Sequence, residues 1–133
     1  MDIEVHRVTP PDALNLDYVR TPRAKASVRG SLHDRSATDL LIHLQHALVD
    51  RTGLDTGLVD DVVVGCASQV DEQGANIART AAVLAGWGDG VPGVTLNRFC
   101  ASGIDAVAQS AARVRIGDLD LAVAGGVESV SRV

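Results

Sequence analysis

The sequence is poor in aromatic residues, with one tryptophan, one tyrosine and one phenylalanine among 133 residues. Valine, leucine, isoleucine and alanine must therefore fill the interior, which suits a tightly layered α/β packing. Composition alone also allows a helical bundle or a barrel. With 46% hydrophobic residues, the chain is long enough for one domain with a sizeable core and too short for two independent domains.

Cysteines are also few, because the chain has only Cys66 and Cys100. Two cysteines do not make a disulfide framework, and the N-terminus has neither the basic start nor the apolar run of a secretory signal. We therefore expect a cytoplasmic protein. No apolar run approaches the ~18 residues that a membrane-spanning helix needs, so we expect no membrane partner.

Positive charge is in deficit, and the formal net charge is −5. No basic stripe interleaved with aromatic residues offsets this charge, which argues against nucleic acid as a partner. The one basic cluster comprises Arg20, Arg23, Lys25 and Arg29. We interpret it as a solvated loop, with a loop that contacts an anion as the alternative. The glycine-rich motifs that hold phosphate at a helix start are missing, and the glycine pair at 125–126 is interpreted as a turn.

What the sequence does contain is an alternation of strand and helix patterns after an N-terminal extension, residues 1–13. Ser36, followed three residues later by Asp39, resembles the cap that starts the first helix, and Gly117 ends the third helix. This alternation implies right-handed crossovers, so we predict one α/β domain over residues 14–133, a layered α-β-α fold with a mostly parallel sheet. Helices are expected at residues 36–53, 75–84 and 101–116, and strands at residues 14–19, 59–65, 94–98 and 119–124.

Two of the expected helices carry distinctive faces. In the first helix, His43 and His46 lie three residues apart, and Asp39 and Asp50 continue the same stripe. A solvated face is favoured over a metal site, because the stripe faces away from the leucines. The many alanines of the third helix are expected to let it lie close to the sheet. Its apolar face consists of Ile104, Val107, Ala108, Ala111 and Val114.

The two cysteines differ in their sequence surroundings. Cys66 follows a run of valines and a glycine, which favours a small core residue. Cys100 lies at the junction between a strand expected to be buried and the first turn of a helix, where unpaired N–H groups and the helix dipole favour a thiolate. The small residues at 101–103 leave the sulfur open to an acyl group and its carrier. Position alone leaves a nucleophile and a structural cysteine as equal alternatives for Cys100.

The segment Leu-Asn-Arg-Phe-Cys-Ala-Ser-Gly-Ile-Asp-Ala-Val at residues 96–107 resembles the nucleophile segment of the thiolases. These enzymes cleave 3-ketoacyl-CoA with CoA or condense two acyl-CoA molecules. The resemblance covers residues 14–133 and implies the same layered α/β fold. Further segments resemble thiolase landmarks in the family's order: Arg-Thr-Pro at 20–22, Gly-Ser-Leu at 30–32, Val-Asp-Asp-Val-Val-Val-Gly-Cys at 59–66, Gln-Gly-Ala-Asn-Ile-Ala-Arg-Thr-Ala at 73–81 and Ala-Gly-Gly-Val-Glu-Ser at 124–129.

The resemblance also implies a reaction. By the family's mechanism, Cys100 takes an acyl group from acyl-CoA as a thioester, and a second acyl-CoA carbanion or free CoA then collects it, with ping-pong kinetics. The backbone N–H of Cys100 would contribute to an oxyanion hole. CoA is a substrate, and neither a cofactor nor a metal is implied. Two departures from the family pattern, Arg23-Ala24 after Arg-Thr-Pro and Val130 in place of a methionine, suggest a particular subgroup.

A complete thiolase has a loop domain and a second half of similar fold, and three catalytic motifs of that half are missing here. The chain has no Gly-His-Pro, Asn-Glu-Ala-Phe or Cys-x-Gly segment. We therefore expect residues 1–133 to be the N-terminal half of a thiolase, with the loop domain and C-terminal half absent, that carries the nucleophile and does not turn over alone. The alternatives are a naturally short, non-catalytic binding or assembly module and a relative of the same fold such as a ketosynthase.

The resemblance finally implies partners. The halves of a thiolase pack together, and the family forms dimers or tetramers, so we expect this chain to expose apolar surface. The expected partners are acyl-CoA and CoA, the missing C-terminal half, and further copies of the chain in a homodimer or homotetramer.

Overall fold

The structure is a computed structural model and describes residues 12–133. The predicted extension at residues 1–13 therefore falls almost entirely outside the described residues. The elements in chain order are α1 (Ala37–Thr52), η1 (Thr56–Leu58), β1 (Asp61–Gly65), η2 (Asp71–Gln73), α2 (Ile77–Leu84), β2 (Gly93–Leu96), α3 (Ser102–Arg115) and β3 (Ala122–Gly126).

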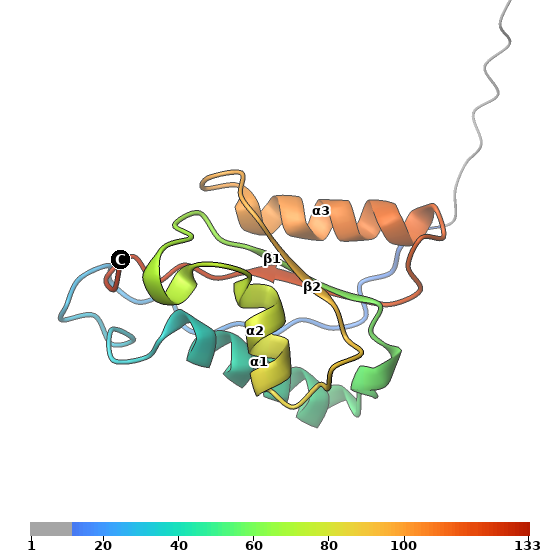
Figure 1. Ribbon diagram of the computed structural model, residues 1–133, viewed down its shortest axis with the longest axis horizontal. Coiled ribbons are helices and arrows are strands. Elements are labelled where there is room, and N and C mark those ends of the chain that lie inside the picture. Colours follow the sequence, from blue (N-terminus) through green and yellow to red (C-terminus); the bar gives the residue numbers. More distant parts are fainter. Residues whose placement is uncertain (1–11) are drawn as a thin grey trace, which may run out of the picture.

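The three strands form a parallel sheet in the order β2-β1-β3. In the central strand, Val63 is in register with Val94 of β2 and Ala124 of β3. Figure 1 shows the sheet edge-on between two helical layers, with α3 along one face and α1 and α2 on the other. The predicted α/β class and parallel sheet are confirmed, with three strands over residues 12–133 where four were predicted.

The main hydrophobic core lies between the sheet and the α1–α2 layer. Side chains alternate between the faces of a strand, so Val62, Val64 and Cys66 point to this side while Val63 points toward α3. Small residues on α2 allow that helix to pack closely over β1 and β2. The buried core residues are Ala37, Leu41, Val59, Val62, Val64, Cys66, Ile77, Ala78, Ala81, Ala82, Trp87 and Val91.

The first helix begins and ends where its sequence signals indicate. The Ser36 side chain accepts a hydrogen bond from the N–H of Asp39, and the Asp39 carboxylate accepts one from the N–H of Ser36, which completes a capping box. Gly53 ends the helix with φ +70°, a left-handed conformation that glycine adopts without steric cost. The cap predicted from the sequence is confirmed.

The strand predicted at residues 14–19 is wrong. This segment is irregular, and the side chains of Leu14, Leu16 and Tyr18 are 72–78% exposed. Its alternating pattern is that of a half-buried strand, but Asp17 forms an ion pair of 2.9 Å with Arg51 at the end of α1. The segment is thus tied to the helical layer and does not join the sheet.

The prediction of which face of α3 packs on the sheet is also wrong. Ser102, Ala106 and Ser110 are the buried residues of this helix, whereas Ile104 and Val107 of the predicted apolar face are 78% and 51% exposed. Small residues face the sheet because the helix lies too close for larger ones. The larger apolar side chains therefore form an outer, uncovered face.

The strand that leads to Cys100 is less buried than predicted. It forms the edge of the sheet as β2, and Val94 is 42% exposed. The residues of a strand do not by themselves give its place in the sheet, and an edge position leaves one side of the strand open.

Candidate active site

Cys100 lies in a sharp turn between β2 and α3. The strand ends at Leu96 and the helix begins at Ser102, so the thiol sits at the junction predicted from the sequence. The Cys100 residue is exposed. The residue before it, Phe99, has a φ of +50°, which is a left-handed backbone conformation. A left-handed conformation at a residue other than glycine costs about 1–3 kcal/mol and persists only where neighbouring contacts hold it. We call residues 97–102 the elbow.

Two side chains hold the elbow. The Ser102 hydroxyl accepts a hydrogen bond of 2.8 Å from the N–H of Arg98 and donates one of 2.6 Å to the carbonyl of Phe99. The Asn97 side-chain oxygen accepts a hydrogen bond of 2.7 Å from the N–H of Phe99. Sequence reasoning identified the small residues after Cys100 but missed these two roles. A serine and an asparagine flanking a turn were the available signal, because both bond readily to nearby backbone.

Three glycines bring the first turn of α3 against the carboxyl ends of β1 and β3. A Cβ atom on Gly65 would lie 2.2 Å from the backbone carbon of Ser102, and one on Gly126 would lie 3.0 Å from the Cα of Gly103. Side chains at either strand end would therefore push the helix away. The glycines fix the depth at which the elbow sits over the sheet.

An ion pair on the exposed side of the elbow connects it to α3. The Arg98 guanidinium lies 2.9 Å from the Asp105 carboxylate in the first turn of α3. The hydrogen bond from Arg98 is the main reason that the pKa of Asp105 is lowered, and a hydrogen bond from Gln109 adds to it. The negative charge also suits the positive end of the helix dipole.

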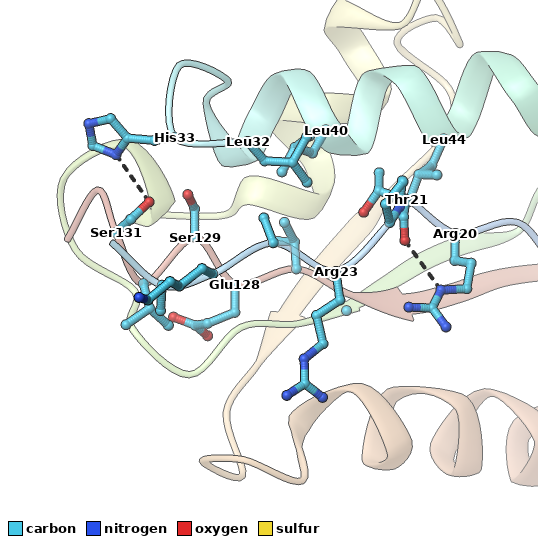
Figure 2. Close-up of a pocket in the computed structure, with 17 residues that line it drawn as sticks. Arg20, Thr21, Arg23, Leu32, His33, Leu40, Leu44, Glu128, Ser129 and Ser131 are labelled. Atoms are coloured by element: carbon cyan, nitrogen blue, oxygen red, sulfur yellow. Dashed lines mark hydrogen bonds between the residues drawn. The ribbon is translucent and has the colours of Figure 1, made fainter. Parts of the chain in front are cut away.

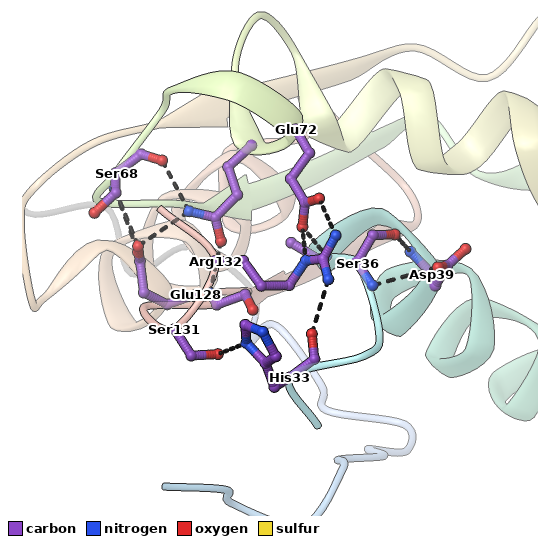
Figure 3. Close-up of polar contacts among 11 residues, drawn as sticks. His33, Ser36, Asp39, Ser68, Glu72, Glu128, Ser131 and Arg132 are labelled. Atoms are coloured by element: carbon purple, nitrogen blue, oxygen red, sulfur yellow. Dashed lines mark hydrogen bonds and ion pairs between the residues drawn. The ribbon is translucent and has the colours of Figure 1, made fainter. Parts of the chain in front are cut away.

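The loops after β1 and β3 lie at the same end of the sheet as the elbow. The Glu128 carboxylate accepts hydrogen bonds from the N–H groups of Ala67, at 2.7 Å, and Ser68. It also accepts one from the side-chain amide of Gln73, which is fully buried (Figure 3). The Gln73 side-chain oxygen in turn accepts a 2.6 Å hydrogen bond from the N–H of Ser129. These bonds join the two loops.

A second polar cluster lies beyond these loops. Arg132 bonds through two nitrogens to the Glu72 carboxylate, at 2.6 and 2.7 Å, and donates to the carbonyl of His33 at 2.8 Å (Figure 3). His33 also bonds to the Ser131 hydroxyl at 3.1 Å. This cluster ties residues near the end of the chain to η2 and to the start of α1.

Cys66 lies at the end of β1 and is fully buried. Burial raises the pKa of its thiol, and the negative charge of Glu128 raises it further. Both causes favour the neutral thiol, which is a poor nucleophile. The interpretation of Cys66 as a small core residue is confirmed.

A groove of about 530 Å³ runs beside the loop after β3. One wall is the basic segment at 20–26, and the opposite wall includes Leu40 and Leu44 of α1 (Figure 2). Arg20, Arg23 and Lys25 line the groove and remain exposed, as a solvated loop predicts.

Two histidines, His33 and His46, form hydrogen bonds away from the elbow. His46 on α1 bonds to the carbonyl of Ala85 at 3.1 Å, and His33 belongs to the polar cluster around Arg132. Over residues 12–133, no three His, Cys, Asp or Glu side chains gather in a way that could hold a metal ion. In that same part of the chain, no helix is long and apolar enough to cross a membrane.

Comparison with known families identifies a match over most of the chain. The family profile described as "Thiolase, N-terminal domain" matches residues 16–133. The acetyl-CoA acetyltransferase of Bacillus anthracis is similar in structure, with a TM-score of 0.72 and 37% sequence identity. That similarity covers 77% of this chain and 26% of the solved one.

Curated relatives show the same relationship at the level of sequence. A β-ketoadipyl-CoA thiolase of Pseudomonas aeruginosa is 48% identical over 117 residues, which is 87% of this chain and 29% of that protein. A 3-oxoadipyl-CoA/3-oxo-5,6-dehydrosuberyl-CoA thiolase of Escherichia coli is 44% identical over 91% of this chain and 30% of its own length. A 3-ketoacyl-CoA thiolase of Bacillus subtilis is 39% identical over 92% of this chain and 31% of its own length. The chain therefore spans about 30% of the relatives it matches.

Proposed function

The chain belongs to the thiolase family, in its N-terminal domain, and we propose that it supplies the nucleophile of an acyl-CoA acyltransferase through Cys100. The observation that carries this proposal is an exposed thiol on a fixed elbow, in a sequence of this family. The complete protein cleaves 3-ketoacyl-CoA with CoA or condenses two acyl-CoA molecules. We expect the 133 residues by themselves not to turn over, because their sequence has no Gly-His-Pro, Asn-Glu-Ala-Phe or Cys-x-Gly segment to supply the remaining catalytic groups.

In the cleavage direction, the thiolate of Cys100 attacks the keto carbon of 3-ketoacyl-CoA, and a carbon–sulfur bond forms. The carbon–carbon bond next to that carbon then breaks, and its electron pair leaves with the acetyl-CoA carbanion, which takes up a proton. A CoA thiolate attacks the resulting Cys100 thioester, releases the shortened acyl-CoA and restores the thiolate. Dividing the reaction at a covalent intermediate replaces one difficult step with two easier ones.

The surroundings of Cys100 support an acyl-accepting role. Ala101 and Gly103 are small, so no large side chain follows the sulfur on the helix side. The N–H of Cys100 contributes to an oxyanion hole, where a fixed donor stabilises the charge that develops on the carbonyl oxygen. CoA acts as a substrate, and the proposal requires no metal and no separate cofactor.

We also propose that the outer face of α3 is an interface. Ile104 and Val107 expose apolar surface on a helix whose other face is packed on the sheet, and β2 is an open edge strand. The partners are the remaining part of a thiolase and further copies in a homodimer or homotetramer. Sedimentation of the purified chain tests this: Ile104→Glu should abolish self-association, whereas a wild-type monomer with a cooperative melt would favour a short independent module.

The domain boundaries and location complete the proposal. Residues 14–133 form the N-terminal thiolase domain, and residues 1–13 are an extension before it. We place the protein in the cytoplasm, which is supported by both cysteines being free thiols.

The direct test joins residues 1–133 to the remaining part of the Pseudomonas aeruginosa β-ketoadipyl-CoA thiolase, which supplies the rest of the length. The joined protein should cleave 3-oxoadipyl-CoA or acetoacetyl-CoA in the presence of CoA, while the chain alone should not. Cys100→Ser in the joined protein should reduce the rate by several orders of magnitude, and Cys66→Ser should retain turnover. A folded joined protein without CoA-dependent cleavage would contradict the proposal.

A further inference from the structure

The Asn97 side chain joins two loops at the carboxyl end of the sheet. Its oxygen accepts the 2.7 Å hydrogen bond from the N–H of Phe99, and its amide nitrogen donates a 2.8 Å hydrogen bond to the carbonyl of Ala67. The first bond lies within the elbow that carries Cys100. The second reaches the loop after β1, thirty residues earlier in the chain. One side chain therefore sets both the shape of the elbow and its position relative to the neighbouring strand.

The contact with Ala67 continues to a charged group. The N–H of Ala67 donates to the Glu128 carboxylate at 2.7 Å, and that carboxylate also holds Ser68 and the buried Gln73. The elbow after β2, the loop after β1 and the loop after β3 are thus connected through Asn97, Ala67 and Glu128. Gln73 at the far end is fully buried, and breaking its hydrogen bonds would leave polar atoms unpaired in the interior, which makes this connection stiff.

The role of Asn97 goes beyond holding the turn of the elbow. Ser102 independently holds the same turn by bonding to both Arg98 and Phe99. What Ser102 does not provide is a bond to the loop after β1, because its partners all lie in the elbow. Asn97 alone among the side chains that bond the elbow backbone also reaches the neighbouring loop, within the part of the chain that the structure describes.

We infer that Asn97 is a positioning residue for Cys100. Its side chain holds Phe99 in the left-handed conformation and bonds the elbow to the connection formed by Ala67 and Glu128. The inference rests on the proposed function, since it concerns the thiol that accepts the acyl group. Acyl transfer needs the sulfur within close reach of the carbonyl carbon, and displacement of a nucleophile by about 1 Å can cost a hundredfold in rate. Asn97 does not touch the reacting atoms and acts through the backbone on either side of Cys100.

The single phenylalanine of the chain provides a direct readout. Selective ¹⁵N labelling of phenylalanine gives one backbone amide signal, which reports the bond from Phe99 to Asn97. In the 133-residue chain, Asn97→Ala should accelerate hydrogen exchange at this amide by at least about tenfold. Asn97→Asp keeps the acceptor and loses the donor to Ala67, so it should restore protection of the amide.

Asn76→Ala is the matched control. Asn76 caps α2 and, like Asn97, bonds to backbone through both atoms of its amide, to Arg79 and Gly93, but none of its partners lies in the elbow. It should lower the melting temperature while leaving the Phe99 amide protected. An amide that is unprotected in the wild type, or unaffected by Asn97→Ala, would overturn the inference.

Kinetics of the joined protein described above then separate positioning from stability. Asn97→Ala should lower kcat by about tenfold to a hundredfold with little change in KM, Asn97→Asp should recover only part of this loss, and Asn76→Ala should leave kcat unchanged. Equal kcat values for wild type and Asn97→Ala would overturn the inference. A folded wild-type joined protein without turnover would instead contradict the proposed function, and the amide measurement on the chain would still decide whether Asn97 holds the elbow.

Discussion

Cys66 and Cys100 each follow a strand of the same parallel sheet, and the structure gives the two thiols opposite surroundings. Cys66 comes directly after the central strand β1 and points into the core between the sheet and the α1–α2 layer. Cys100 follows the edge strand β2 by four residues and is exposed. The sheet therefore does not decide which cysteine is accessible. The connection after the strand does.

The difference lies in what the backbone does next. After β1 the backbone N–H groups of Ala67 and Ser68 bond to Glu128, whose charge also raises the pKa of the Cys66 thiol. After β2 the backbone turns at Phe99, which has a left-handed conformation, and Cys100 is exposed to solvent before α3 begins. A strained turn with side-chain support thus exposes one thiol, whereas continuing the chain from the strand into the core buries the other.

The largest expected difference between the two regions is in alkylation. Iodoacetamide should modify Cys100 of the folded chain at least about a hundredfold faster than Cys66, because a fully buried thiol reacts only after local or global opening. Peptide mass spectrometry at successive times measures both rates in one sample. Urea above the unfolding transition should bring the two rates together. Similar rates in the folded chain would show that the loop after β1 opens freely.

The same reagent tests what the remaining part of a thiolase adds to the chain. Cys100 should react more slowly in the 133-residue chain than in the joined protein, because the proposed function has a base from the remaining part of a thiolase activate the thiol. Equal rates would mean that the elbow and the helix terminus alone set its reactivity.

The next effect should come from the residue that connects the two regions. Gly65 precedes Cys66, and its missing Cβ makes room for the backbone of Ser102 in the elbow. Gly65→Ala should reduce the free energy of unfolding by about 1–3 kcal/mol, since backbone on both sides of the contact must move. Gly125→Ala is the control, because a Cβ there meets nothing within 4 Å. Urea denaturation of both variants makes the comparison, and equal stabilities would refute the tight contact.

The sequence predicted these regions unequally, for physical reasons. The capping box at Ser36 and the Cys100 junction depend on residues close together in sequence, and both were placed correctly. The faces of α3 were assigned from periodicity, which finds the apolar stripe but does not tell whether the sheet or a partner covers it. The bond from Asn97 to Ala67 spans thirty residues, so only the fold reveals it.

A pH dependence at alkaline pH should distinguish Cys66 further. Burial raises its pKa above the ordinary thiol value of 9.0, so the folded state keeps the proton longer than the unfolded state does. This contribution to stability is fully present below about pH 9 and is lost as pH rises through the folded pKa. Cys66→Ala should therefore flatten the loss of stability above pH 9, as measured by urea denaturation. An unchanged slope would contradict a protonated, buried thiol.

The smallest effect should come from the polar cluster that anchors the loop after β1 from outside. The hydrogen bond from Arg132 lowers the pKa of Glu72 below the ordinary glutamate value of 4.5. The pair therefore stabilises the fold fully above about pH 4.5, and this stabilisation is lost as pH falls through the pKa of the folded state. Glu72→Gln should slightly lower stability at pH 7 and reduce its dependence on acid. Both side chains are partly exposed, which limits the contribution of the pair. If Glu72→Gln instead accelerated alkylation of Cys66, the outer cluster rather than Glu128 would be what keeps that loop closed over the buried thiol.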